Sequence, residues 1–157
     1  MTPAHSHCIF CDIIKGAAEV SVCYEDGVAL AFMDVQPVNN GHTLVVPRRH
    51  FESFDDLDPE VGQHLFALAM QLGPLIRKVT GCAGMNLIVS SGAAAGQDVY
   101  HFHIHLIPRT QDDGFDVPLP FPGSKVPDRT VLDAMAAQLI SALRDPARAR
   151  EVAGARS

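Results

Sequence analysis

Residues 100–107 read Tyr-His-Phe-His-Ile-His-Leu-Ile, so three histidines alternate with three large apolar side chains. Side chains on a β-strand point alternately to the two faces of a sheet. A strand over residues 99–107 would therefore place His101, His103 and His105 on one face and the apolar residues on the other. A solvated face that happens to be histidine is one interpretation, but a row of three imidazoles favours a chemical function.

Two kinds of chemistry fit a row of imidazoles. One is metal binding, because neutral imidazole is a common ligand. The other is nucleophilic catalysis at phosphorus, in which a ring nitrogen forms a covalent phosphohistidine and divides one difficult displacement into two. The attacking ring would need its second nitrogen to donate to a fixed acceptor, while flanking imidazoles stabilise the phosphoryl oxygens.

A long amphipathic helix is predicted over residues 58–80. Asp58 and Pro59 have the side chains preferred at the N-cap and at the first helical position. Apolar residues then recur at spacings of three and four, which predicts one buried helical face. The members of this stripe are Val61, Leu65, Leu68, Leu72, Leu75 and Val79.

The remaining patterns predict an α+β domain with an antiparallel five-stranded sheet and two main helices. A turn at residues 25–27 joins the first two strands into a hairpin. The expected elements are a short helix over 8–15, strands at 20–24, 28–33, 42–47, 85–90 and 99–107, and a second main helix that starts near Asp128 or Thr130 and contains residues 131–143.

Composition narrows the class of protein. The chain has 157 residues, 47% of them hydrophobic, and a net charge of −6, which suits one compact domain. Without a basic run, a long nucleic acid is not an expected partner. No apolar stretch reaches the ~18 residues of a membrane helix, and the first residues do not resemble a signal peptide. We therefore expect a cytoplasmic protein, in which cysteines are thiols or metal ligands.

Several segments together resemble the histidine triad (HIT) family of nucleotide hydrolases and transferases, closest to its bacterial Hint- and Fhit-like members. The similar segments are Cys-Ile-Phe-Cys-Asp-Ile-Ile-Lys-Gly at 8–16, Phe-Met-Asp at 32–34, Gly-His-Thr-Leu-Val-Val-Pro-Arg-Arg-His at 41–50, and residues 96–109 around the histidines. The resemblance implies a HIT-like fold whose sheets join across a homodimer. It suggests a flexible N-terminus over 1–7 and a single domain over 8–145, with a core at 8–109 and a helical extension at 110–145, followed by a flexible tail over 146–157.

The resemblance also implies catalytic residues. His103 would be the nucleophile that takes up the nucleotidyl group, and His105 would contact phosphate or leaving-group oxygens. Gln97 would lie near the phosphate. Asp98 departs from the family pattern, because Ser or Thr is usual there and assists the leaving group. An ionised aspartate would repel a phosphate, whereas a protonated one could act as a general acid.

The nucleotide-binding residues follow in the same way. Asp34 would bind the ribose hydroxyls, since a carboxylate can accept from both, and His42 would lie behind the nucleotide. Ser90 stands where related members carry Asn or Gln, so a phosphate-side contact there could pass to water. The base would enter an apolar slot, although each of its residues could equally be ordinary core: Ile9, Phe10, Phe32 and Val35.

Cys8 and Cys11 form a Cys-x-x-Cys pair, which is half of a tetrahedral zinc site. His50 and His101 are the candidates for the other half, and the resemblance implies a structural Zn²⁺ held by all four residues, with no catalytic cofactor. Two buried thiols without a metal are the alternative. A redox role is less favoured, because the pair is not followed by a βαβ unit.

Three functions therefore compete. The first is a hydrolase or nucleotidyltransferase that cleaves at the α-phosphorus of a nucleoside phosphoramidate or dinucleoside polyphosphate through a nucleotidyl-His103 intermediate. The second is a purine-nucleotide sensor with weak or no catalysis, which Asp98 and Ser90 would favour. The third is a metalloenzyme with a water-bound ion at His101, His103 and His105. In the first two the partner is a small, AMP-containing nucleotide.

Overall fold

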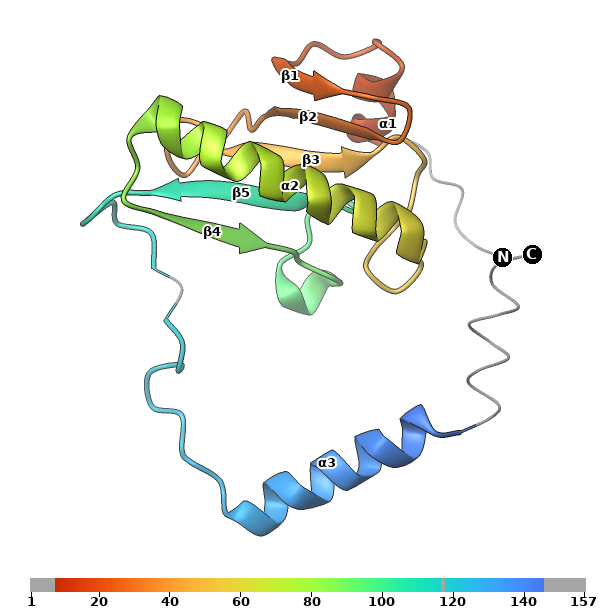
Figure 1. The fold of residues 1–157 in the computed structure, drawn as a ribbon, viewed down its shortest axis with the longest axis vertical. Coiled ribbons are helices and arrows are strands. Elements are labelled where there is room, and N and C mark those ends of the chain that lie inside the picture. The colour runs from red at the N-terminus through yellow and green to blue at the C-terminus, as the bar shows by residue number, and fades with distance from the viewer. Residues whose placement is uncertain (1–7, 117, 146–157) are drawn as a thin grey trace. The chain divides into compact units, whose positions relative to one another are not determined.

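The structure is a computed structural model that describes residues 8–116 and 118–145, and Figure 1 shows its elements. The chain divides into two compact units, the first ending at Phe115 and the second beginning at Asp116. Each unit is described by itself. Among the described helices, none combines the length and the apolarity that crossing a membrane would require.

The first unit is an antiparallel sheet with helices, which confirms the predicted α+β class. The sheet has five strands in the order β1-β2-β3-β5-β4, and every pairing is antiparallel. Its elements are α1 (Ile9–Ile14), β1 (Val22–Glu25), β2 (Ala29–Met33), β3 (Thr43–Pro47), α2 (Pro59–Thr80), β4 (Gly84–Ile88), the short 3-10 helix η1 (Ala93–Ala95) and β5 (Ile104–Arg109).

The sheet is covered on both faces, and the two faces form separate cores. Leu65, Leu68 and Leu72 of α2 pack with Val45 and Leu106 on one face (Figure 1). On the other face, Phe10 of α1 packs with a second set from the same strands: Leu30, Phe32, Leu44 and Val46. Strands β2 and β3 are therefore buried on both sides, which explains why their sequences are continuous apolar runs rather than alternating ones.

The histidine-containing strand is shorter than predicted. β5 begins at Ile104, because its ladder with β3 starts at the pair Val45 and Ile104, and residues 100–103 are outside the strand. The segment before β5 is held by a backbone hydrogen bond, in which the Phe102 N–H donates to the Phe51 carbonyl at 2.7 Å. Phe102 belongs to the core under α2, whereas the His103 ring lies against Phe10 of α1. Phe102 and His103 therefore point to opposite faces as predicted, although they are not part of the strand.

Helix α2 begins as predicted, with the Asp58 side chain accepting from the Glu60 N–H. The predicted apolar stripe is wrong at its end, where Leu75 is 57% exposed and Val79 is 85% exposed. After Leu72 the core takes Ile76, which packs against it. Successive residues on a helix are about 100° apart, so placing Ile76 inward turns Leu75, and with it Val79 four residues later, toward solvent.

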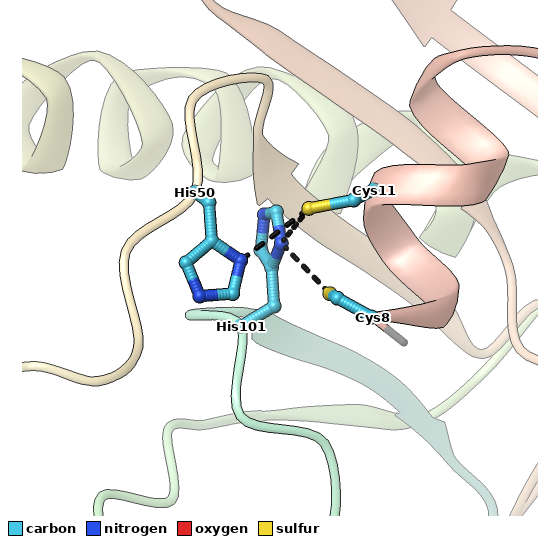
Figure 2. Close-up of side chains that lie close together, drawn as sticks. All are labelled: Cys8, Cys11, His50 and His101. Carbon is cyan, nitrogen blue, oxygen red and sulfur yellow. Dashed lines mark hydrogen bonds between the residues drawn. The ribbon is translucent and has the colours of Figure 1, made fainter. Parts of the chain in front are cut away.

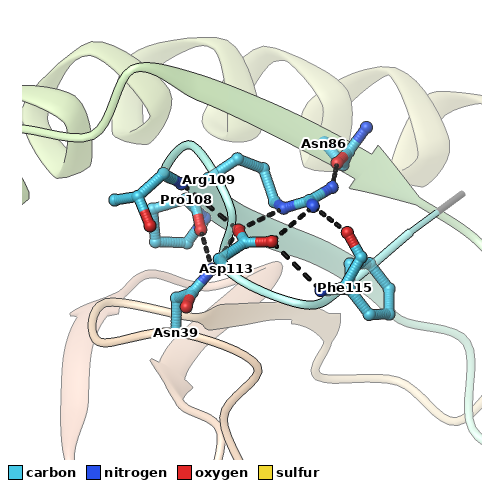
Figure 3. Close-up of polar contacts among 7 residues, drawn as sticks. Asn39, Asn86, Pro108, Arg109, Asp113 and Phe115 are labelled. Atoms are coloured by element: carbon cyan, nitrogen blue, oxygen red, sulfur yellow. Dashed lines mark hydrogen bonds and ion pairs between the residues drawn. The ribbon is translucent and has the colours of Figure 1, made fainter.

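The carboxylate of Asp113, whose side chain is 4% exposed, holds the end of the first unit (Figure 3). Arg109 of β5 donates to both oxygens of Asp113 at 2.7 Å, and Asn39 of the β2–β3 loop donates to the same carboxylate at 2.7 Å. Arg109 also donates to the Asn86 side chain of β4, and the Phe115 N–H donates to Asp113. Arg109 above all holds the pKa of Asp113 well below its ordinary value. The turn after β5 is thus tied to three parts of the sheet.

The second unit contains one helix, α3 (Arg129–Leu143), in its described part, residues 116 and 118–145. The Asp128 side chain caps it by accepting from the Thr130 N–H at 2.9 Å, which confirms the predicted helix. Its apolar side chains are exposed, including Val131, Met135, Leu139 and Leu143. The extent of the predicted single domain, 8–145, stays a prediction, and the segments 1–7 and 146–157 lie outside the described residues.

Candidate active site and metal centre

A cavity of about 600 Å³ opens on the α1 side of the sheet. The four apolar residues that sequence reasoning assigned to a base all line it: Ile9, Phe10, Phe32 and Val35. Phe10 and Phe32 are buried and belong to the core as well, with their rings edge-to-face at 5.5 Å. Ile9 and Val35 are exposed by 44% and 84%, so they form a rim and are not ordinary core.

The polar residues of the cavity come from three parts of the chain. Asp34 follows β2, His42 precedes β3, and Asp98 comes from the loop after η1. His103, just before β5, and His105, within it, also line the cavity. Five of the predicted site residues, separated by up to 71 positions in the sequence (34 to 105), are therefore brought into one cavity.

His103 is held in one tautomer by the backbone. Its Nδ1 lies 2.8 Å from the His101 carbonyl oxygen, which can only accept, so Nδ1 carries the proton. Burial lowers the pKa of His103, which is 7% exposed, so the ring is neutral at pH 7. A neutral ring with its proton on Nδ1 keeps a lone pair on Nε2, and this is the form that a nucleophile requires.

His105 is held in the opposite tautomer by a chain of donors. The Val38 N–H donates to His42 Nδ1 at 3.2 Å, so the proton of a neutral His42 is on Nε2. His42 Nε2 then donates to His105 Nδ1 at 3.0 Å and lies 3.5 Å from an Asp34 carboxylate oxygen. Burial lowers the pKa of both rings, that of His105 to about 4. A neutral His105 that accepts at Nδ1 must carry its proton on Nε2.

The two neighbouring imidazoles therefore offer opposite groups within one cavity. Their ring centroids are 4.7 Å apart. His103 offers a lone pair, and His105 offers an N–H donor. A nucleophile beside a preoriented donor is an arrangement that can attack phosphorus and stabilise the charge that develops on its oxygens.

Gln97 is buried, and its side chain bonds to the backbone of three residues. Its side-chain oxygen accepts from the Gly92 N–H at 2.7 Å, and its nitrogen donates to the carbonyls of Glu52 at 2.7 Å and Val99 at 3.1 Å. These bonds fasten the loop over residues 92–99. Gln97 and Ser90 are not among the described residues that line the cavity, whereas Asp98, next to Gln97, is.

Sequence reasoning missed several contributors to the site, of which two bear on its chemistry. Glu19 lines it from the segment between α1 and β1, and it belongs to no motif. The Val38 N–H sets the tautomer of His42, and a backbone group leaves no signal in the residue type. Only the three-dimensional structure could identify either of them.

Four predicted metal ligands lie together in a second cluster (Figure 2). Cys8 and Cys11 come from α1 and its N-cap, His50 from the loop after β3, and His101 from the segment before β5. Their ligand atoms all lie within 4.8 Å of one another. The cluster therefore brings α1 together with the loop after β3 and the segment before β5.

The geometry of this cluster fits a tetrahedral zinc ion. The His101 Nδ1 lies 3.4 Å from the Cys8 sulfur and 3.6 Å from the Cys11 sulfur, and His50 Nδ1 lies 3.3 Å from the Cys11 sulfur. Zinc bonds of ordinary length at tetrahedral angles put sulfur and nitrogen about 3.6 Å apart. His101 Nε2 donates to the Pro47 carbonyl at 2.8 Å, which leaves its Nδ1 lone pair facing the thiols.

The three triad histidines do not form one metal site. Among residues 8–116 and 118–145, His101 groups with the two cysteines and His50, and His105 groups with Asp34 and His42. His103 belongs to neither group. The interpretation as a metalloenzyme with one ion shared by all three histidines therefore does not match the geometry.

The chain is similar in sequence to known proteins. Residues 15–112 match the HIT domain. The chain is 38% identical over 106 residues to adenylylsulfatase HINT3 of Arabidopsis thaliana, covering 68% of this chain and about half, 54%, of that relative.

Two solved structures share the fold. The crystal structure of SMU.412c from Streptococcus mutans is 33% identical with a TM-score of 0.83, covering 92% of this chain and 90% of the other. A zinc-bound histidine triad family protein from Mycobacterium smegmatis is 34% identical with a TM-score of 0.66, covering 86% and 96%.

Proposed function

Because the chain belongs to the HIT domain family, we propose that it is a nucleotide hydrolase or nucleotidyltransferase that works through a covalent nucleotidyl-His103 intermediate. The observation that carries this proposal is the pair of opposite tautomers, a lone pair on His103 beside an N–H on His105. The bond cleaved joins the α-phosphorus of a nucleotide to a nitrogen or oxygen, as in nucleoside phosphoramidates or dinucleoside polyphosphates. The name of the Arabidopsis relative, an adenylylsulfatase, is consistent with this class.

The shape of the cavity suggests how the nucleotide binds. The base lies between Phe10 and Phe32 at the buried end and the rim residues Ile9 and Val35. The ribose hydroxyls donate to Asp34, one oxygen of which already accepts from the Gln36 N–H at 2.8 Å. The phosphate lies against the two imidazoles. Gln97 acts indirectly, by holding the loop that carries Asp98.

The reaction proceeds in two displacements. The His103 Nε2 lone pair forms a bond to the α-phosphorus, and the bond from phosphorus to the leaving atom breaks. The leaving atom keeps that electron pair and takes a proton from solvent. Water then attacks the phosphorus and loses a proton, the nitrogen–phosphorus bond breaks, and its electron pair returns to Nε2. His105 stabilises the phosphoryl oxygens in both steps with its Nε2–H.

The intermediate itself provides the test of this function. An adenosine 5′-phosphoramidate is mixed with the protein, quenched within one turnover and analysed by mass spectrometry. We expect a transient increase equal to one adenylyl group, located on the peptide that contains His103, together with release of AMP. Binding of AMP with no turnover of the phosphoramidate would instead favour the alternative function, a purine-nucleotide sensor.

The relay through His42 predicts a pH dependence. Protonation of His105, whose pKa is about 4, would break the donor chain from His42. Because burial lowers the pKa of His105 in the folded protein, His105 is entirely in its active neutral form at higher pH. It loses this form as the pH falls. We expect kcat/KM to be level between about pH 6 and 8 and to decrease at lower pH as the pH approaches the pKa of His105.

A variant separates this relay from general effects of acid. His42→Ala removes the donor that orients His105, so we expect kcat/KM to fall about tenfold or more at pH 7. His64→Ala is the matched control, because His64 pairs with Asp26 and does not line the cavity. Equal activity of His42→Ala and wild type would show that the relay has no part in the reaction.

We propose that the Cys8, Cys11, His50 and His101 cluster holds a structural Zn²⁺. The sulfur–nitrogen distances and the tautomer of His101 support this, and a zinc-bound relative of the same fold is consistent with it. Four protein ligands leave no open position, so the ion would anchor α1 and would not take part in the reaction. No catalytic cofactor enters the two displacements.

We also propose a homodimer formed through β4 and the adjoining surface of α2. β4 is an edge strand, and its neighbourhood exposes Leu87 and Val89, with Phe66 and Met70 on α2. An unpaired edge beside exposed apolar side chains favours strand pairing with a second copy.

Leu87→Lys should lower the mass measured by light scattering to that of a monomer. Val22→Lys, on the opposite edge strand, should remain a dimer, and a monomeric wild type would contradict the proposal.

A further inference from the structure

Carboxylates are the charged groups of the cavity. Glu19, Asp34 and Asp98 line it, while the histidines His42 and His105 are neutral at pH 7 because burial lowers their pKa values. Among the described residues that line the cavity, none is Lys or Arg. The formal charge of the lining is therefore negative, which disfavours additional anionic groups on the substrate.

The three carboxylates differ in what they already contact. Asp34 accepts from the Gln36 N–H and lies beside His42, on the wall proposed for the ribose. Asp98 comes from another wall, the loop after η1, and it is exposed. It lines the same cavity as His103, whose ring is proposed to attack the phosphorus. Asp34 is assigned to the ribose, so the wall that carries Asp98 is available for the part of the substrate beyond the phosphate.

The position of Asp98 is fixed by the buried residue before it. Gln97 is 4% exposed and makes three hydrogen bonds to the backbone, two within its own loop and one to Glu52 in the loop after β3. The backbone at Asp98 is thereby held in place, and its exposed carboxylate lines the cavity.

From these observations we infer that Asp98 selects the leaving group by charge, and that the preferred substrates are nucleoside 5′-phosphoramidates whose amine carries a second, cationic group. This inference rests on the proposed function and specifies its substrate class. A cationic side chain would form an ion pair with Asp98 while His103 attacks the phosphorus. A carboxylate or a further phosphate in the same place would be repelled.

Three substrates of matched length test this inference on the full chain. They are the adenosine 5′-phosphoramidates of 1,3-diaminopropane, butylamine and β-alanine, whose free ends are cationic, neutral and anionic. We expect kcat/KM to decrease in that order, with about a tenfold ratio between the cationic and the anionic substrate. Because Asp98 is exposed, the ratio should shrink when the salt concentration is raised to about 0.5 M.

Variants assign the effect to this side chain. Asp98→Asn should bring the ratio close to one, and Asp98→Glu, which keeps the charge, should retain most of it. Asp55→Asn removes the same charge from an exposed site that does not line the cavity, and its ratio should match that of wild type. The ratio of two substrates on one protein is unaffected by a change in overall rate or in the folded fraction.

The outcomes separate this inference from the function on which it rests. Turnover of all three substrates at similar kcat/KM by wild type would overturn the inference and leave the proposed function intact. An unchanged ratio in Asp98→Asn would overturn it as well. Turnover of none of the three would overturn the inference, and absence of turnover of a dinucleoside polyphosphate as well would overturn the proposed function.

Discussion

Replacing His103 with asparagine is expected to lower kcat/KM on a nucleoside phosphoramidate by at least about 10⁴-fold, because the first displacement loses its nucleophile. Asparagine has no lone pair on nitrogen that can attack phosphorus. Its amide can still donate to the His101 carbonyl, which accepts from His103 Nδ1 at 2.8 Å. The substitution therefore removes the chemistry and retains the local hydrogen bond. The measurement is steady-state release of AMP together with the intermediate detected by mass spectrometry.

Two controls make this result specific. Binding of AMP by calorimetry should persist in His103→Asn, because the base slot and Asp34 are unchanged. His64→Asn, which replaces a histidine of α2 outside the cavity, should keep its activity. Turnover by His103→Asn within a factor of about ten of wild type would rule out a nucleotidyl-His103 intermediate.

Loss of the metal cluster is expected to have the largest effect on stability. Cys11→Ser, or removal of zinc by a chelator, should lower the free energy of unfolding by about 3 kcal/mol or more, because the ion links α1 to two distant segments. Activity should fall too, since His101 is both a proposed ligand and the residue whose carbonyl holds His103. Zinc content by elemental analysis and denaturant unfolding with and without chelator would measure both effects.

Cys23→Ser is the matched control for the metal cluster. Cys23 is an exposed free thiol on β1 and does not belong to the cluster. It should keep the zinc content, the unfolding midpoint and the activity of wild type. Purified protein without zinc, with the same unfolding curve in chelator as without it, would contradict a structural zinc ion and favour two buried thiols.

Some features could be predicted from the sequence because they depend on local repetition. The spacing of Leu65, Leu68 and Leu72 predicts a helix with one buried face, and the alternation of His103 with Phe102 and Ile104 predicts opposite faces. Both follow from the geometry of the backbone itself. The Cys-x-x-Cys spacing likewise indicated half of a metal site, and the structure places the ligand atoms of His50 and His101 beside both cysteines.

Other features depended on contacts that no local pattern contains. Either Leu75 or Ile76 could follow Leu72 on a helical face, and only the packing against the sheet selected Ile76. The strand was predicted from residue 99 because the alternation continues there, but a strand also requires a partner, and the ladder with β3 begins at Ile104. Gln97 was expected near the phosphate, which stays a prediction, and only the structure shows that its side chain bonds to the backbone of two loops.

The identity of the chemical groups was thus determined by the sequence, and their protonation and orientation were decided by the tertiary structure. His103 and His105 are the same residue type two positions apart, yet one offers a lone pair and the other a proton. The difference comes from the His101 carbonyl on one side and from His42, 63 residues away, on the other. A tautomer is selected by whichever partner lies within hydrogen-bonding distance, and that distance exists only after the chain has folded.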